Sequence, residues 1–344
     1  MPRSGRGSVK NSFRTIEVSQ APNIYPGFVH LMLHSLLPET FAPCTLYLEA
    51  FNPHLKRLRL VPAMDVGSRI DNEWLEGLLS EGVSHFYVAW DDLDAMIEYL
   101  YRQTRRLLAA TPDQGTRHRL LYEITLCSVK AALMDPRNGR RLALGVESVK
   151  QVIDEIWEED TTRKGLLRVM SSDREVFTHS VNVGILGVAF ARALGWPKEK
   201  VRDLGVGLFF HDLGLVEPSQ DQDTYTQPQL SGQLAREEEL TDHPWVSRRF
   251  LSQVPQVSTL SLQTVLTHHE NIDGSGFPQG LAGDDLADSD RLGRMVDFYE
   301  YHTSGCGKAE GLSPYVVLKY MREEMAAKVD QDMLTEFIKF LGKA

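Results

Sequence analysis

The distribution of apolar residues changes near residue 105, and this change constrains the fold more than any other feature. Beyond it, apolar residues recur at three- and four-residue spacing in one segment after another, which is typical of amphipathic helices. The segments with this period are 120–134, 145–158, 173–194, 198–210, 257–269, 291–302 and 313–327. Such a succession of helices predicts an all-α helical bundle over residues 105–344.

The first part of the chain has a different pattern. Short runs rich in β-branched and aromatic residues alternate with proline and glycine, which predicts strands joined by turns. The expected strands are 13–18, 29–33, 45–48 and 85–88, with one helix around 72–80. Within 1–104 we therefore expect a disordered Gly/Ser/Lys/Arg-rich start, followed by a small α/β domain for regulation or docking. The expected fold class is α+β.

Composition limits the classes of partner. The chain has 344 residues and a formal net charge of -10, which argues against nucleic acid as a partner. A phosphate ligand would need a local positive centre. No apolar run approaches the length of a membrane span, and the start lacks the apolar block of a signal peptide, so we expect a cytoplasmic protein without membrane contact. The three cysteines have no CxxC spacing, which indicates neither a disulfide framework nor a thiolate zinc site.

The run from 267 to 278 sets two adjacent imidazoles beside carboxylates and a glycine-rich turn. His268 and His269 follow an apolar helical segment and would repel each other if both were charged. As neutral ligands they can bind one cation together. Asp273-Gly274 is by itself only a turn signal.

Further histidines and carboxylates of the helical part lie in apolar or helix-terminal settings: Glu175, His179, His211, Asp212, His243 and Asp297. His211-Asp212 ends a very apolar run, in which an unpaired carboxylate would be costly to bury. His243 precedes Pro244, which suits the first turn of a helix, so we expect His243 at a helix entrance.

Each of these residues also has a structural explanation. Glu175 could complete a capping box with Ser172, His179 could be a hydrogen-bonded core residue, and His243 could cap a helix. Their joint occurrence favours a metal site. Inward histidines and carboxylates from several helices can hold two metals, with a carboxylate as the bridge.

The order of these motifs resembles the HD-GYP family, the cyclic di-GMP phosphodiesterase branch of the HD-domain hydrolases. The resemblance spans roughly residues 172–300. It rests on Glu175-x-x-x-His179, His211-Asp212-x-Gly214, His243-Pro244, His268-His269-Glu270-x-x-Asp273-Gly274-x-Gly276-Phe277-Pro278 and Asp297.

The resemblance implies the metal ligands and the reaction. One metal would be held by His179, His211, Asp212 and Asp297, and the second by Asp212, His243, His268 and His269. Asp212 would be the bridge and the central catalytic carboxylate, and Glu175 would help to bind a third metal, as in some members. The metals are typically iron, with manganese as the alternative. The expected reaction is hydrolysis of cyclic di-GMP by a bridging hydroxide, with Glu270 and Asp273 supporting the ligands.

The departures from the family pattern lie on the substrate side. Phe277 replaces the tyrosine of Gly-Tyr-Pro, Leu215 replaces a lysine, and Lys308 is the one basic residue left near the family's later phosphate positions. We expect Gly276, Phe277 and Lys308 to contact substrate, with activity that is weak or altered in specificity. One alternative is a catalytically degenerate signalling protein that acts by ligand or partner binding through its first domain. Another is a metal phosphohydrolase for a different nucleotide.

Overall fold

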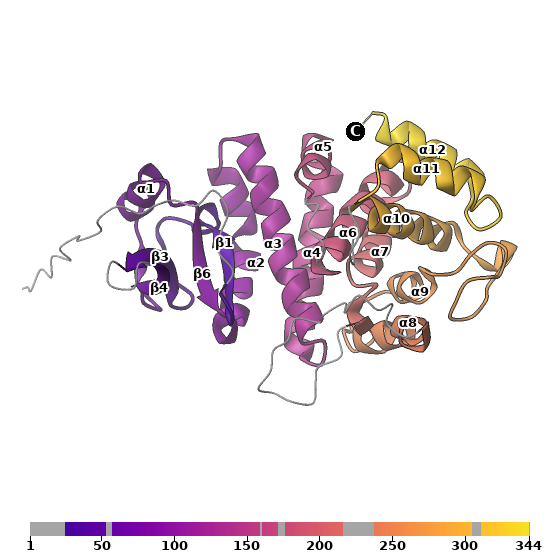
Figure 1. The fold of residues 1–344 in the computed structure, drawn as a ribbon. Coiled ribbons are helices and arrows are strands. Elements are labelled where there is room, and N and C mark those ends of the chain that lie inside the picture. The colour runs from indigo at the N-terminus through magenta and orange to yellow at the C-terminus, as the bar shows by residue number, and fades with distance from the viewer. Residues whose placement is uncertain are drawn as a thin grey trace, which may run out of the picture. The chain divides into compact units, whose positions relative to one another are not determined.

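The computed structural model describes residues 25–52, 57–158, 160–170, 176–215, 237–304 and 311–343. The chain divides into two compact units, Met1–Leu107 and Leu108–Ala344, which Figure 1 draws as a ribbon. The expected strand at 13–18, the expected disordered start, Glu175 and Lys308 lie outside the described residues. The predicted α+β class is confirmed, because a small sheet unit precedes a helical one.

The first unit is built on an antiparallel sheet with the strand order β1-β6-β3-β4. These strands are β1 (Phe28–Met32), β3 (Leu46–Asn52), β4 (Arg57–Met64) and β6 (His85–Ala89). The short strands β2 (Thr40–Phe41) and β5 (Arg69–Ile70) form a separate pair, and the helices are α1 (Asn72–Ser80) and α2 (Leu93–Ala110). The Tyr99 hydroxyl accepts a hydrogen bond of 2.7 Å from the Leu37 backbone N–H, which ties α2 to the loop after β1.

The second unit is helical. Its α-helices are α3 (Gln114–Met134), α4 (Gly139–Glu158), α5 (Asp160–Val169), α6 (Val176–Ala193), α7 (Lys198–Phe209), α8 (Glu237–Leu251), α9 (Thr259–Thr267), α10 (Asp288–Ser304), α11 (Pro314–Glu323) and α12 (Gln331–Leu341). Every residue from 177 to 191 is buried, so α6 is the central helix. A helix that is apolar on all sides requires such a position. Phe190 of α6 packs against Phe337 of α12 with ring centroids 5.0 Å apart.

Small residues let the helices that carry or precede the candidate ligands approach one another closely. A Cβ atom at Gly184 of α6 would lie 2.5 Å from the Phe209 ring of α7. A Cβ atom at Gly207 of α7 would lie 2.7 Å from the Cβ of Thr264 in α9. These crossings bring together the C-terminal ends of α7 and α9, which are followed by the His211-Asp212 and His268-His269 pairs.

The expectation that His243 lies at a helix entrance is wrong. Helix α8 begins at Glu237, and Pro244 lies inside it. Proline removes one backbone hydrogen bond from a helix interior. The burial of His243, Ser247 and Leu251 along one face of α8 offsets this loss, because tertiary packing supplies most of the stability of a protein helix.

Candidate metal centre

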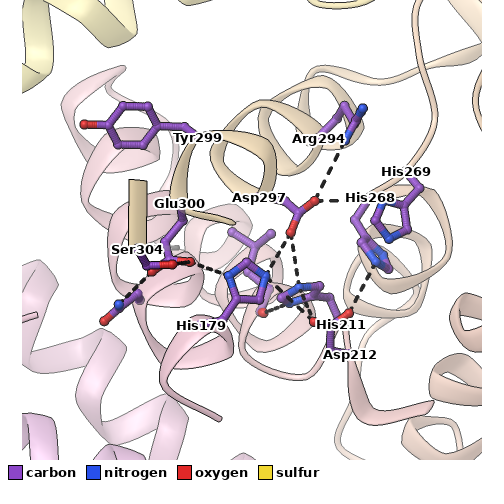
Figure 2. Close-up of polar contacts among 12 residues, drawn as sticks. His179, His211, Asp212, His268, His269, Arg294, Asp297, Tyr299, Glu300 and Ser304 are labelled. Carbon is purple, nitrogen blue, oxygen red and sulfur yellow. Dashed lines mark hydrogen bonds and ion pairs between the residues drawn. The ribbon is translucent and has the colours of Figure 1, made fainter. Parts of the chain in front are cut away.

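Seven candidate ligands from five parts of the helical unit meet in its interior, and Figure 2 labels all of them except His243. They are His179 of α6, His211 and Asp212 after α7, His243 of α8, His268 and His269 after α9, and Asp297 of α10. They include three groups of three whose ligand atoms lie within 4.8 Å of one another, and the third group, His211, Asp212 and His268, shares one histidine with each of the other two. The first group is His179, His211 and Asp297, and the second is His243, His268 and His269.

Asp212 lies between the first and second groups and directs one oxygen to each. Its Oδ2 is 3.2 Å from Nε2 of His211 and 3.7 Å from Nε2 of His179. Its Oδ1 is 3.4 Å from Nε2 of His243 and 3.7 Å from Nε2 of His268. A carboxylate in this position can share its two oxygens between two cations.

Asp297 completes the first group and reaches toward the second. Its Oδ1 is 3.1 Å from Nε2 of His179 and 3.4 Å from Nε2 of His211. Its Oδ2 is 3.9 Å from Nδ1 of His269. The two aspartates therefore lie on different sides of the histidine cluster, with every ring within reach of at least one carboxylate.

Backbone carbonyls set the orientation of two imidazoles. Nδ1 of His211 donates to the Leu208 carbonyl and Nδ1 of His268 donates to the Val265 carbonyl, each over 2.7 Å. In the neutral form of each ring the proton is thus held on Nδ1, and the Nε2 lone pair faces the cluster. Nε2 of His211 is buried and has no hydrogen-bond partner among the described residues. An orphaned buried nitrogen that faces two carboxylates fits a ligand of a divalent cation.

A buried carboxylate orients the third ring. Nδ1 of His179 hydrogen-bonds to Glu300, whose other oxygen accepts a 2.7 Å hydrogen bond from the Asn182 amide. Asn182 in turn accepts a 3.0 Å hydrogen bond from the Tyr122 hydroxyl of α3. This chain leaves Nε2 of His179 facing Asp297, which is the arrangement of a carboxylate–histidine–metal triad.

The electrostatics favour ionised aspartates. Burial alone would raise the pKa values of Asp212 and Asp297, but the surrounding histidines outweigh burial and hold both values well below the usual range. Burial also lowers the pKa of His211, but Asp212 outweighs it and raises that pKa to about 9. In the absence of a cation, a proton on His211 offsets the negative charge of the aspartates.

The adjacent histidines behave differently from His211. Burial lowers the pKa of His269 to about 3 against the opposing effect of Asp297, and His243 and Arg294 act in the same direction as burial. Burial and the neighbouring rings hold the pKa of His268 well below its usual range. Both rings are therefore neutral near pH 7, the form in which imidazole binds metals.

The glycine-rich loop after α9 is shaped by Glu270. Its carboxylate accepts hydrogen bonds from the backbone N–H groups of Gln279, Gly280 and Leu281, over 2.7, 3.1 and 3.1 Å. The Asp273 carboxylate accepts two hydrogen bonds from Ser275, one from its backbone N–H over 2.9 Å and one from its hydroxyl over 2.6 Å. Both predicted supporting residues thus contact the loop.

The loop folds back on the histidine pair. A Cβ atom at Gly276 would lie 2.4 Å from the Asn271 nitrogen and 2.5 Å from the His269 carbonyl oxygen, so no side chain fits there. The Phe277 ring stacks on the His269 ring, with centroids 4.5 Å apart and an interplanar angle of 29°. Gly276 and Phe277, both expected to contact substrate, therefore lie beside the second group of candidate ligands.

Some residues of the site were not identified from the sequence. Arg294, Asp297 and Glu300 are spaced by three along α10, which places them on one side of the helix. This spacing could have identified Arg294 and Glu300. No local sequence signal indicates Tyr122, Asn182 or Asn271, because their contacts join distant parts of the chain.

Comparisons with known proteins show which proteins this chain is similar to. Residues 168–333 match the family model described as HD domain. Cyclic di-GMP phosphodiesterase PA4108 of Pseudomonas aeruginosa is 30% identical over 245 residues, which is 67% of this chain and 55% of that protein. Cyclic di-GMP phosphodiesterase PdeB of Borreliella burgdorferi is 29% identical over 113 residues, 32% of this chain and 28% of that protein. The chain thus spans about half the length of the first relative and less of the second.

A solved structure supports the fold across both units. Bd1817, a HDG"Y"P protein from Bdellovibrio bacteriovorus, superposes with a TM-score of 0.62 at 16% identity. The match covers 92% of this chain and 99% of that chain. No described helix has the length and apolar character needed to cross a membrane. Residues 168–333 thus match the HD-domain family, and the order of the ligands resembles its HD-GYP branch, with Phe277 at the tyrosine position of the Gly-Tyr-Pro motif.

Proposed function

We propose that the helical unit hydrolyses a phosphodiester bond of cyclic di-GMP with two divalent cations. The observation that carries this proposal is the position of Asp212, whose oxygens face different groups of histidines. His179, His211 and Asp297 would hold one cation, and His243, His268 and His269 the other, with Asp212 shared between them. Iron is the proposed metal and manganese the alternative, because histidine and carboxylate ligands suit both.

Two bound cations would supply a nucleophile from water near neutral pH and neutralise the charge of the phosphodiester. The residues of the chain fix where this happens. Asp212 and Asp297 provide the negative charge that retains the cations, and the carbonyls of Leu208 and Val265 orient two of the rings. Six of the seven candidate ligands are buried, so access to the cluster is restricted.

We propose that the opening of the centre lies at His269, the most exposed of the seven candidate ligands. The side chain of His269 is 23% exposed, against 8% for Asp212 and 3% for His179. Phe277 stacks on this ring and therefore borders the opening, where an aromatic face can contact a nucleobase. Phe277 lacks the hydroxyl of the family's tyrosine, and Leu215 stands where the family has a lysine. We therefore propose slow turnover or altered specificity. Gly276 and Lys308 are the remaining proposed substrate contacts.

The test is an assay of the purified, metal-loaded protein against cyclic di-GMP and the linear dinucleotide pGpG, with products resolved. We expect slow, metal-dependent conversion of cyclic di-GMP, abolished by a chelator and by Asp212→Ala. No conversion at full metal occupancy would contradict the proposal and favour a role in ligand or partner binding. Conversion of pGpG alone would favour a phosphohydrolase for another nucleotide.

A further inference from the structure

Arg294 approaches the same oxygen of Asp297 as His269, at the proposed opening of the metal centre. Its Nη1 is 3.9 Å from Oδ2 of Asp297, and the same Oδ2 is 3.9 Å from Nδ1 of His269. The guanidinium and the most exposed candidate ligand ring thus approach Asp297 at one oxygen, and Figure 2 shows both beside Asp297. The Arg294 side chain is 16% exposed, against 7% for Asp297.

The guanidinium of Arg294 is held in place on two further sides. Its Nε–H donates a 2.9 Å hydrogen bond to the Asn271 side-chain oxygen, and its carbon lies 5.4 Å from the centroid of the Phe298 ring. Among the described residues these contacts engage Nε, Nη1 and one face of the group, and Nη2 makes no hydrogen bond. An arginine fixed in this way loses little side-chain entropy when it binds a ligand.

A polar chain connects this arginine to the glycine-rich loop. The Asn271 amide donates to the Ser275 hydroxyl over 3.1 Å, and Asp273 accepts from the same hydroxyl over 2.6 Å. The loop that carries Phe277 therefore also sets the position of Asn271 and, through it, of Arg294. This coupling gives Asp273 a function beyond that of a turn residue.

The charge of Arg294 has no equivalent near the cluster. Among the described residues, no other lysine or arginine forms an ion pair with Asp212 or Asp297. The chain carries a net charge of -10 and has Leu215 at the position of the family's lysine. Among the described residues, Arg294 is thus the cationic side chain that is fixed next to the candidate ligands and could meet a phosphodiester beside His269.

We propose that Arg294 is a substrate-contacting residue that binds a phosphate oxygen next to the metal centre and substitutes for the missing lysine. The proposal rests on the proposed function for the identity of the substrate, a phosphodiester. The binding of an anion by Arg294 beside the metal centre can be tested separately. Nη2, directed by the contacts of Nε and Nη1, would donate a charge-assisted hydrogen bond to the phosphate. The Asn271 amide would be a positioning residue that aims the guanidinium.

The test compares Arg294→Gln, Arg294→Lys and Asn271→Ala with the parent protein after metal loading. Orthophosphate affinity, KM for cyclic di-GMP and metal content per chain are measured for each. Loss of the charged contact should weaken phosphate binding and raise KM about 10- to 100-fold in Arg294→Gln, with metal content retained. The phosphate affinity and KM of Arg294→Lys should lie between those of the parent and Arg294→Gln. Asn271→Ala should weaken phosphate binding about 2- to 10-fold, because the guanidinium is no longer held in position.

Arg291, one turn earlier on α10, provides a matched control. It pairs with Asp330 over 3.0 Å and with the Gly283 carbonyl over 2.9 Å, so Arg291→Gln should lower thermal stability and leave phosphate affinity unchanged. The proposal is overturned if Arg294→Gln loses metal while phosphate affinity per loaded chain stays constant, because Arg294 would then serve only Asp297. Unchanged phosphate affinity with full metal content overturns it as well.

The two proposals can fail separately. If the parent protein binds orthophosphate in an Arg294-dependent manner but does not turn over cyclic di-GMP, the anion subsite stands and the proposed function fails. If cyclic di-GMP is hydrolysed with the same KM in parent and Arg294→Gln, the function stands and the subsite fails. Should Arg294→Gln not fold, Arg294→Lys and Asn271→Ala carry the same comparison.

Discussion

Asp212 joins the two halves of the metal centre through its separate oxygens. Substitution by alanine should remove a ligand from both cations and take away the carboxylate oxygen that faces His243 and His268. We expect Asp212→Ala to lose both metals, whereas His243→Ala should mainly release one, because His243 faces only Oδ1. Elemental analysis of anaerobically purified variants measures this. Equal loss of metal in the two variants would contradict a bridging Asp212.

Glu300 acts on the centre through His179. Replacing it with glutamine keeps the size of the side chain but weakens the hold on Nδ1 of His179. We expect Glu300→Gln to lower metal affinity about 10- to 100-fold, as measured by competition with a chelator. Ser304→Ala is the control, because Ser304 contacts the same carboxylate only over 3.3 Å. A matching loss in both variants would point to a general packing defect.

At the scale of the elements, the positions of the ligands depend on close helix crossings. The turn η3 (Leu213–Leu215) packs against α8, and a Cβ atom at Gly214 would lie 2.4 Å from the His243 carbonyl oxygen and 2.8 Å from the Ser247 nitrogen. The Ser247 hydroxyl also accepts a 2.7 Å hydrogen bond from the Gly214 N–H. No side chain can be added at this contact without moving α8.

Gly214→Ala should therefore destabilise the helical unit by about 1–3 kcal/mol, the usual cost of overpacking. It should also reduce metal occupancy, because α8 carries His243. Gly293→Ala in α10 is the matched control, since its added Cβ atom would meet Leu208 at an ordinary 3.6 Å. Thermal unfolding and metal content of the two variants are the measurements. Equal stability of both variants would show that α8 adjusts freely.

The sequence predicts elements better than it predicts how they meet. Apolar periodicity identified the helix around His179 and the segment that ends before His268, because burial leaves a local trace. The start of α8 was misplaced at His243-Pro244, since a proline signal outweighed packing that only the folded chain reveals. Arg294 and Asn271 are 23 positions apart in the sequence, and nothing in their local surroundings predicts their contact.

For the whole molecule, the metal-free centre couples stability to pH. His211 has an unfolded pKa of about 6.5 and a folded pKa of about 9 without metal. The stability gained from its proton is therefore complete below about pH 6.5 and is lost as pH rises toward 9. The pKa of His179 is also raised, because its hydrogen bonds to Asp297 and Glu300 outweigh burial, and it acts in the same direction.

Below about pH 6.5, His268 and His269 determine how the stability of the metal-free protein changes with pH. His268 and His269 have lowered pKa values, so the unfolded chain binds more protons there and stability falls as the pH drops below about 6.5. We expect the thermal midpoint of the metal-free protein to be highest near pH 6.5 and to decline toward pH 9. Metal loading should remove the decline, because bound cations replace the protons. Identical pH profiles with and without metal would contradict this assignment.

The central claim is that seven side chains of the helical unit hold two cations with Asp212 between them. Anomalous diffraction from crystals of the metal-loaded protein, recorded at the absorption edge of the bound metal, tests it most directly. The account predicts two peaks per chain, one beside His179, His211 and Asp297 and the other beside His243, His268 and His269, both in contact with Asp212. A single peak at full loading, or two peaks of which only one contacts Asp212, would contradict it.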